Sequence, residues 1–420
     1  MTDADRALLI RCFEAAIAAA DPKAALAAHL PEKPRGRTVV IGAGKGAAQV
    51  AQAFEALWDG PLEGVIVTRY GYAAPCRQLN VLEAAHPVPD EAGLAATREV
   101  LAALEGLSED DLVVALVTGG GSALLAAPPE GLELADEVAL NEALLASGAP
   151  IGAMNAIRKQ VSRVKGGRLA AAAAPARMVS LIVSDVPGDD PGEVASGPTV
   201  PTTVGRAAAM QAIRDYDIAL PERIMAHLHE APEDAPDPAD PRFARNSVTV
   251  IASAARSLEA AAEVAEAEGV PAAILSDAVE GEAREVAKVH AAIAREVQAK
   301  DRPFTKPVMI LSGGETTVTL RGKGRGGRNS EFLLSLALEI EGVAGIAALA
   351  ADTDGIDGSE DNAGAFADGD TVAAMRAAEV DPAALLHGND AYSAFEAVGA
   401  LFEPGPTGTN VNDFRAILLR

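Results

Sequence analysis

Apolar and polar positions follow two patterns along the chain: short runs of consecutive apolar residues, and longer segments with apolar residues at helical spacing. In the first half, the short runs predict strands at 38–41, 64–68, 79–83, 112–117 and 178–183. The helical spacing predicts helices at 4–29, 47–57, 91–104, 132–174 and 204–229. Strands that alternate with helices favour a mainly parallel sheet covered by helices.

The second half of the chain repeats this alternation. Strands are expected at 248–252, 272–276, 308–311, 316–320 and 345–350, and helices at 254–268, at 281–298 and from Asn329 onward. Between the halves, the segment 230–244 mixes proline with acidic residues and has almost no apolar positions, which is typical of a linker. We therefore predict an α/β protein of two domains, at 1–240 and 241–420.

Charge and composition narrow the classes of partner. The chain has 420 residues and a net charge of −25, which argues against nucleic acid and anionic membrane surfaces as partners. An anionic small-molecule substrate would need a local group of arginine and lysine side chains. The apolar runs are shorter than the ~18 residues of a membrane span, and the acidic start lacks the pattern of a signal peptide.

Cysteine content bears on the compartment. Cys12 and Cys76 are too few for a disulfide framework and lack the spacing of a metal site, so we expect a reducing compartment, the cytoplasm. The sequence leaves the oligomeric state open, and a homodimer is one option.

The stretch 311–340 concentrates the most unusual chemistry of the chain. A buried strand ends at Ser312, Gly313 and Gly314, with Glu315 at the tip of the turn. The next segment, 321–328, alternates glycines with basic residues, including Arg325 and Arg328, and then Asn329 starts a helix. Exposed backbone N–H groups, positive side chains and a helix N-terminus together favour an anion. The alternative is a solvated hairpin tip with a basic flap.

Two glycine-rich turns in the first half resemble phosphate-binding loops. The first, Gly42 to Gly46, contains Gly44 and Lys45 but fits neither standard phosphate loop, and its lysine can alternatively be an ordinary turn residue. The second follows the strand 112–117; its candidate binding residues are Gly119, Gly120, Gly121 and Ser122. Both turns lie between a strand and a helix, as in nucleotide-binding α/β units.

The end of the second strand distinguishes between nucleotides. A dinucleotide-binding protein has an acidic residue there to bind the ribose. This chain has Thr68 and Arg69 instead, which disfavours NAD and leaves an NADP-like site through Arg69 as a weaker option.

Acidic residues complete a set suited to phosphoryl transfer, which needs cations, a base and carboxylates for Mg²⁺. Lys45, Arg325 and Arg328 are the candidate cations, and the base is Asp189 or Asp190, which alternatively form a hydrogen-bonded turn. The candidate metal ligands are Asp185, Glu315 and Asp352. The segment 352–358 resembles the start of an EF-hand loop but lacks its closing glutamate, which disfavours calcium. Some of the basic residues of 158–168 share a helix face, and surface salt bridges are one interpretation of them.

Nine segments together resemble the glycerate 2-kinase family. They are VVIGAGKGAAQVAQAFE, HPVPDEAG, TGGGSALL, NAIRKQVSRVKGGRLA, SDVPGDDPGEVASGPT, SGGETTVTL, GRGGRNSEF, ADTDGIDG and GTNVND. The resemblance covers nearly the whole chain. It implies an N-terminal Rossmann-like domain with a doubly wound sheet and a C-terminal MOFRL domain.

The same resemblance implies an activity. It is the ATP-dependent phosphorylation of D-glycerate at the 2-hydroxyl, with Mg²⁺, to give 2-phosphoglycerate in an interdomain cleft. It also implies active-site roles for Lys45, Asp189 and Arg328. Two alternatives stay open at this point. One is an NAD(P)H-dependent hydroxypyruvate reductase, and the other is a non-catalytic sugar-phosphate sensor that uses the TGGGSALL segment.

Overall fold

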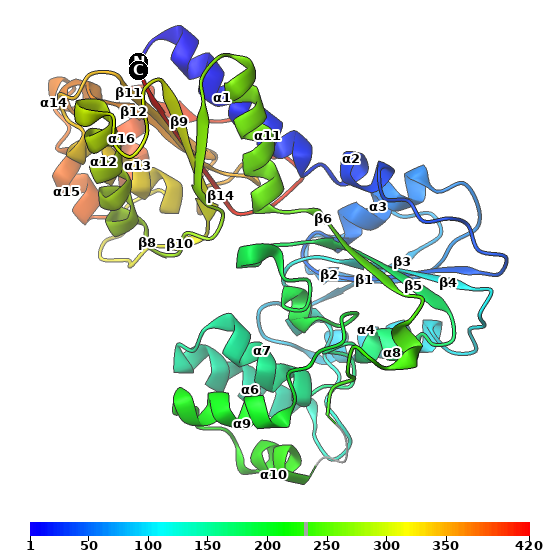
Figure 1. Ribbon diagram of the computed structural model, residues 1–420. Helices are drawn as coiled ribbons and strands as arrows, with labels where there is room; N and C mark the ends of the chain where they lie inside the picture. The colour runs from blue at the N-terminus through cyan, green and yellow to red at the C-terminus, as the bar shows by residue number, and fades with distance from the viewer. Residues whose placement is uncertain (231–233) are drawn as a thin grey trace. The chain divides into compact units, whose positions relative to one another are not determined.

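The computed structural model describes residues 1–230 and 234–420 (Figure 1). It confirms a two-domain α/β fold but divides the chain as 22–251 on one side and 1–21 with 252–420 on the other. The expected domains were 1–240 and 241–420. Residues 1–21 therefore belong to the other unit than expected, and so do residues 241–251. Of the expected linker, residues 231–233 lie outside the described part, while the 3₁₀ helix η3 (Pro241–Phe243) packs against α8 (Arg168–Ala172).

Apolar burial explains the difference. Helix α1 (Asp3–Ala19) buries Leu9 and Phe13 in the same cluster as Leu258 and Phe414 of the C-terminal half. Strand β6 (Ser247–Ala252) extends the sheet of the first unit. The unit to which each element belongs is therefore set by the apolar surface against which it packs. The composition of the expected linker does not set it.

The unit 22–251 is built on a sheet with the strand order β3-β2-β1-β4-β5-β6. Its parallel strands are β1 (Thr38–Ala43), β2 (Glu63–Arg69), β3 (Asn80–Ala84), β4 (Leu112–Val117) and β5 (Arg177–Val183). This is the doubly wound arrangement predicted from the sequence. Every residue of β1 and β4 is buried, because helices cover both faces. The carboxyl ends of the parallel strands share one edge.

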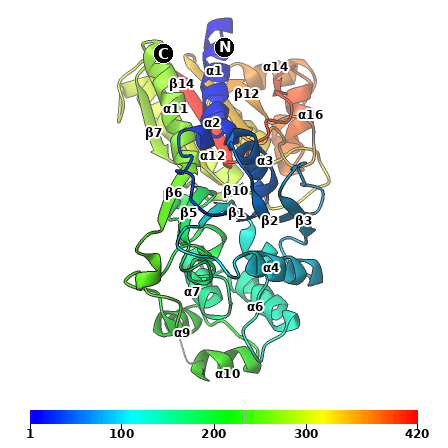
Figure 2. The ribbon, with the colours of Figure 1, turned by 90° about the vertical axis from the view of Figure 1, so that its right-hand side faces the viewer.

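Helices surround this sheet (Figure 1). Helix α3 (Ala47–Leu57) covers one face, and α4 (Glu91–Ala103) and α8 cover the other. The short helix α2 (Pro22–Ala27) packs against α3, and α5 (Gly121–Leu124) packs against α4. A separate apolar cluster joins α6 (Leu134–Ser147), α7 (Ile151–Gln160), α9 (Arg206–Asp215) and α10 (Glu222–Glu230), which lie together in Figures 1 and 2.

The expected continuous helix 132–174 is instead three helices. Helix α6 ends at Ser147, α7 begins after Pro150, and 161–167 is a loop before α8. Proline fixes its own backbone and disfavours helix in the residue before it, so the break falls at Pro150. The loop 184–200 holds only the 3₁₀ turns η1 (Pro187–Asp189) and η2 (Val194–Ser196).

The second unit has a mixed sheet with the order β13-β12-β11-β14-β9-β7. Its strands are β7 (Ala272–Ser276), β9 (Val308–Gly314), β11 (Ile346–Asp352), β12 (Gly364–Asp368), β13 (Leu401–Phe402) and β14 (Asp413–Leu419). Strand β14 lies between β9 and β11 and is antiparallel to both. The hydrophobic pattern beyond residue 350 led to no strand prediction, so the last three strands are new.

Two helical layers enclose that sheet. Helices α1 and α11 (Ala254–Ala267) share one apolar cluster, and α12 (Ala283–Lys300) and α13 (Arg328–Glu339) share the other. The remaining elements are α14 (Thr371–Ala377), α15 (Pro382–His387), α16 (Ala391–Glu396) and the short strands β8 (Gly281–Glu282) and β10 (Thr316–Thr317). The expected strand 316–320 is limited to that pair of residues. Within the described residues, no helix combines the length and apolar character needed to cross a bilayer.

Candidate functional site

The candidate residues fall into two groups, one in each unit. The first group lies at the carboxyl edge of the parallel sheet and comprises Gly44, Lys45, Gly119, Gly120, Gly121, Ser122, Asp185 and Asp189. The second lies where β9, β11, β14 and α13 meet and comprises Ser312, Gly313, Gly314, Glu315, Arg328, Asn329 and Asp352. Arg325 lies in the loop before α13, where it contacts Glu396 and Tyr392.

The turn that carries Lys45 is fixed by neighbouring strands. The Lys45 backbone N–H donates to the Gly119 carbonyl at 2.8 Å, and the Thr68 hydroxyl donates to the Lys45 carbonyl at 3.0 Å. The next amide, of Gly46, donates to Thr118 Oγ1 at 3.1 Å. The Lys45 side chain is half-buried and has no ion-pair partner among the residues that the structure describes. The turn is therefore fixed by its backbone, and its lysine has no counter-charge among the described residues.

Gly120 creates the space in which Lys45 lies. It adopts φ of 80°, and a Cβ placed on it would lie 3.0 Å from Lys45 Cγ and 3.0 Å from His86 Nε2. Both side chains therefore converge on a spot that only glycine leaves open. Burial, together with the positive charges of Lys45 and Arg69, lowers the pKa of His86 to about 4.

The predicted site residues did not include His86, and Arg69 was considered only as the residue of an NADP-like site. Arg69 ends β2, and its guanidinium carbon lies 3.9 Å from the centre of the Tyr72 ring. His86 follows β3 and lies in the HPVPDEAG segment, which was noted only for its resemblance. Their position in the sequence could have identified both residues. A polar residue at the carboxyl end of a parallel strand lies at the edge of the sheet where ligands bind.

The acidic loop 184–200 packs directly on the second glycine turn. A Cβ on Gly119 would lie 1.8 Å from Asp185 Oδ2, so the absence of a side chain lets the carboxylate approach. Ser122 Oγ is 2.5 Å from Ser196 Oγ, and Ser196 donates to Asn155 Oδ1 at 2.8 Å. The turn, the loop and α7 thus form one hydrogen-bonded group.

The loop 184–200 also has strained backbone positions and a carboxylate without a hydrogen-bond partner among the described residues. Asp189, Ala195 and Ser196 all have φ between 53° and 61°, a region costly for residues other than glycine. The Asp189 carboxylate is half-buried, and no hydrogen-bond partner for it occurs among the described residues. Asp190 is exposed and accepts from the Gly192 amide at 2.8 Å. The two neighbouring acids therefore have different environments.

Two lysines of the basic segment 158–168 are buried rather than on the surface. Lys159 is 2% exposed and donates to Glu193 at 2.7 Å. Lys165 is also 2% exposed and donates to Glu137 at 2.7 Å. The Lys159 pair connects α7 to the loop that contains Glu193, and the Lys165 pair connects the segment before α8 to α6.

In the second unit, Arg328 lies among three carboxylates. Its guanidinium donates to Asp413 at 2.5 Å, to Asp352 at 2.7 Å and to Glu315 at 3.4 Å. Burial raises the pKa of Asp352 to about 8, and Arg328 offsets this only in part. Burial also acts to raise the pKa of Asp413, but Arg415 and Arg328 hold it below its usual value. Asp413 lies within the GTNVND segment, which was noted only for its resemblance.

The N-terminus of α13 already has an acidic partner. The Asp357 carboxylate, which is fully buried, accepts from the Asn329 amide at 2.9 Å and the Ser330 amide at 2.8 Å. Asn329 Nδ2 donates to Asp413 at 3.0 Å. The first amides of this helix therefore already bind a carboxylate of the chain, and anion binding on this side depends on the arginine side chains. Asp357 and Asp352 of the EF-hand-like segment serve α13 and Arg328 instead.

The other residues of the second group have varied surroundings. Ser312 is 1% exposed and lies 3.0 Å from His290 Nε2, which indicates a structural role. Gly313 and Gly314 end β9. Arg325 donates to Glu396 at 2.8 Å. Glu315 and Arg328 line a cavity of about 740 Å³ that also contacts Thr316 and Glu331.

The predicted metal ligands do not form a site within either unit. Asp352 and Glu315 both contact the Arg328 guanidinium, and Asp185 belongs to the other unit. In residues 1–230 and 234–420, no group of three or more histidine, cysteine or acidic residues is arranged to hold a metal ion. The residues present do not fit a metal site made by the protein alone.

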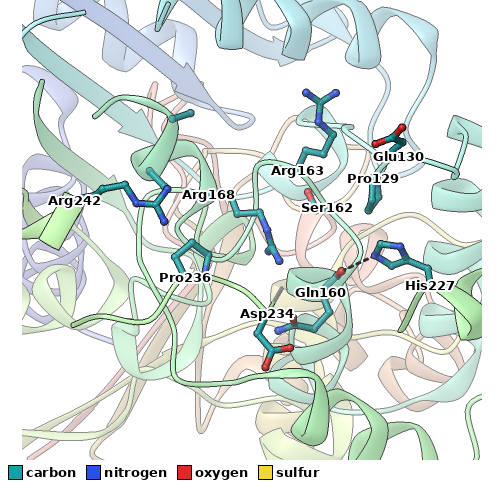
Figure 3. A pocket seen from close by; sticks show the side chains of 12 residues that line it. Pro129, Glu130, Gln160, Ser162, Arg163, Arg168, His227, Asp234, Pro236 and Arg242 are labelled. Atoms are coloured by element: carbon teal, nitrogen blue, oxygen red, sulfur yellow. Dashed lines mark hydrogen bonds between the residues drawn. The ribbon is translucent and has the colours of Figure 1, made fainter. Parts of the chain in front are cut away.

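A further cavity of about 460 Å³ lies within the unit 22–251. Arg163, Arg168 and His227 line it, and Figure 3 shows the Arg168 side chain directed toward Gln160. None of the predicted site residues contributes to it. Its size alone does not indicate function.

The fold and the two residue groups define a two-unit α/β protein with lysine and arginine side chains at its strand ends. Two family models match the chain: a domain of unknown function, DUF4147, over residues 8–229, and the MOFRL family over residues 308–413. A protein of Agrobacterium vitis, provisionally named a hydroxypyruvate reductase, is 52% identical over 99% of this chain and 94% of its own.

The D-glycerate 2-kinase of Thermotoga maritima is 39% identical over 97% of this chain and 96% of its own. The crystal structure of glycerate kinase from the same organism matches with a TM-score of 0.90 and 37% identity, over the whole of both chains. The chain belongs to the glycerate 2-kinase family.

Proposed function

We propose that this protein is a glycerate 2-kinase that transfers the γ-phosphoryl group of ATP to the 2-hydroxyl of D-glycerate, giving 2-phosphoglycerate. The observation that carries the proposal is Lys45, a half-buried cation without a counter-charge in the described chain, held at the carboxyl edge of a Rossmann-like sheet. Such a charge stabilises the oxygens of a transferring phosphoryl group. The family supports the choice of reaction. The residues of the site have the charges that this reaction needs.

Each group of residues has a proposed role. Lys45 binds the transferring group, and the backbone amides of the turn from Gly119 to Ser122 bind other phosphate oxygens. Gly44 supports this site through its lack of a side chain, which leaves room for Thr118, because its own amide donates to the Val67 carbonyl. Asp189 accepts the proton of the 2-hydroxyl, because its carboxylate is half-buried and has no partner in the described chain.

Arg328 has the cationic role in the second unit. Its weakest contact is the 3.4 Å hydrogen bond from Nη1 to Glu315, on the side that lines the cavity. An anionic group of a reactant can replace Glu315 there while Asp413 and Asp352 hold the other nitrogens. Arg325 and Asn329 support this side, Arg325 from the exposed loop and Asn329 through Asp413.

Mg²⁺ accompanies the nucleotide in this proposal. In proteins it is commonly held by one or two carboxylates together with substrate phosphates, and it neutralises charge on those phosphates. That mode of binding needs no three-ligand site. Cys12 and Cys76 are free thiols, which agrees with the cytoplasmic location that we also propose. A homodimer stays a prediction.

Hydroxypyruvate reduction is the second candidate, favoured by the name of the Agrobacterium vitis relative. The end of β2 supports the kinase instead. Thr68 donates to the Lys45 carbonyl, and Arg69 stands where a carboxylate would bind the ribose of NAD.

One assay separates these functions. Purified protein is given D-glycerate with ATP and Mg²⁺, and in parallel hydroxypyruvate with NADH or NADPH. We expect formation of 2-phosphoglycerate in the first reaction and no oxidation of the reduced nucleotide in the second. Nucleotide oxidation without ATP would refute the kinase, and tight binding without turnover in either reaction would favour the sensor.

A further inference from the structure

Three nitrogen-bearing side chains lie at the ends of three adjacent parallel strands. Lys45 follows β1, Arg69 ends β2, and His86 comes two residues after β3. The registers pair β1 with β2 and β2 with β3, with Arg69 opposite Ala84. The three side chains therefore start from neighbouring positions along one sheet edge.

Contacts at Gly120 show that two of these side chains converge. The Cβ position of Gly120 lies 3.0 Å from His86 Nε2 and 3.1 Å from Lys45 Cε. Arg69 acts on the same histidine, because its charge adds to the effects of burial and Lys45 in lowering the pKa of His86. The imidazole is thus neutral at pH 7 and provides a hydrogen-bonding group between two cations.

Nearby carboxylates are engaged elsewhere. Glu83 accepts from the Gly71 amide at 2.8 Å, and Asp90 accepts from the Gly93 amide at 3.0 Å and from Tyr70 at 2.7 Å. In the described part of the chain, neither Lys45 nor Arg69 forms an ion pair. Two adjacent, half-buried cations without counter-charge are unexpected in a chain of net charge −25.

We propose that Lys45, Arg69 and His86 together bind one anionic oxygen group of a reactant, either a phosphate of the nucleotide or the carboxylate of the hydroxy acid. This inference rests on the proposed function and adds two binding residues to it. The planar guanidinium of Arg69 suits two oxygens of such a group, Lys45 provides the point charge, and His86 Nε2 adds one directed hydrogen bond.

Binding measurements test the site without requiring turnover. Isothermal titration calorimetry is done with MgATP alone, D-glycerate alone and 2-phosphoglycerate alone, on the wild type and on Arg69→Gln, His86→Ala and His86→Gln. Arg77→Gln is the matched control, because Arg77 belongs to the same segment and its side chain is 82% exposed.

We expect Arg69→Gln to weaken binding of one class of ligand by about tenfold or more, as loss of a charge-assisted hydrogen bond does. His86→Ala should weaken the same class about fivefold, and His86→Gln should restore most of this because its amide can still donate. Loss for MgATP alone assigns the site to phosphate. Loss for D-glycerate and 2-phosphoglycerate alone assigns it to carboxylate.

Two results would overturn the site. One is unchanged binding of all three ligands in both Arg69→Gln and His86→Ala. The other is equal weakening for every ligand in every variant, including Arg77→Gln. A protein that binds as expected but forms no 2-phosphoglycerate would refute the kinase and leave the anion site standing. A working kinase with unchanged KM values in Arg69→Gln would refute only the anion site.

Discussion

The Arg328 guanidinium donates from Nε to Oδ1 of Asp413 at 2.5 Å, and the Asp413 side chain is completely buried. Arg415, which is 1% exposed, contacts the other oxygen of this carboxylate. A carboxylate removed from water needs such compensation, because unpaired buried charge is costly. Arg328 therefore stabilises the second unit in addition to its proposed role in catalysis.

Arg328→Ala should lower the free energy of unfolding by about 3 kcal/mol, the size of a broken buried pair. Arg328→Lys should recover only part of this free energy, because a lysine ammonium cannot donate to Asp413 and Asp352 in the geometry of the guanidinium fork. Urea unfolding measures both variants. Arg376→Ala, which removes an exposed pair with Glu341, is the control and should cost less than about 1 kcal/mol. Equal stability of the Arg328 and Arg376 alanine variants would contradict this role.

Lys45→Ala should affect activity strongly and stability very little. Loss of a cation at the transferring phosphoryl group should lower kcat by about 10³-fold. The free energy of unfolding should change by less than about 0.5 kcal/mol, because Lys45 has no ion pair in the described chain to lose. Steady-state kinetics and urea unfolding on the same sample test both statements. Lys33→Ala, at an exposed pair with Asp59, is the control for activity. Wild-type kcat/KM in Lys45→Ala would remove Lys45 from the site.

Asp189→Asn and Asp190→Asn should differ strongly. If Asp189 is the base, Asp189→Asn should lower kcat by about 10²–10⁴-fold with little change in KM for glycerate. Asp190→Asn should have a small effect, because an asparagine side-chain oxygen can still accept from the Gly192 amide. Kinetics at several Mg²⁺ concentrations check the assignment. Recovery of Asp189→Asn at high Mg²⁺, or equal damage in both variants, would show that Asp189 is not the base.

Gly120→Ala tests the space beside Lys45. The added methyl group would lie 3.0 Å from Lys45 Cγ and His86 Nε2, so it should displace both side chains and lower kcat by more than about tenfold. Gly106→Ala is the matched control, with φ of 67° and nothing within 4 Å of the added atom. Both variants should lose about 1 kcal/mol of stability from the backbone alone. If the two variants have equal activity, the contact has no catalytic importance.

The low pKa of His86 predicts a contribution to acid sensitivity. Its pKa is about 4 in the folded state and about 6.5 in an unfolded chain. The unfolded state therefore binds more protons between these values, and stability from the neutral imidazole is complete above pH 6.5 and lost as the pH falls toward 4. Because the ring is half-exposed, we expect a loss of only about 1 kcal/mol between pH 7 and pH 5.

Two measurements check the His86 prediction. The NMR titration of His86 should have its midpoint near pH 4, and His86→Gln should lose less stability than the wild type between pH 7 and pH 5. A midpoint near 6.5 would mean that the imidazole is neither desolvated nor near Lys45 and Arg69.

The sequence by itself determined the α/β class, the parallel strands of the first unit and the Lys45 turn. These depend on local order along the chain: a short apolar run, then glycines, then a helix. The structure then shows that the Lys45 turn contacts the Gly119 turn, because parallel strands end on one edge of the sheet.

Only the tertiary structure decided which charges compensate each other. Asp413 is 85 residues from Arg328, and Asp357 is 28 residues from Asn329, so no local pattern could pair them. For the same reason, the sequence could not predict that α1 belongs to the second unit. The apolar face of a helix can pack against many different surfaces. Hydrophobic periodicity records that a residue is buried, whereas its partner depends on how distant strands are ordered in the sheet.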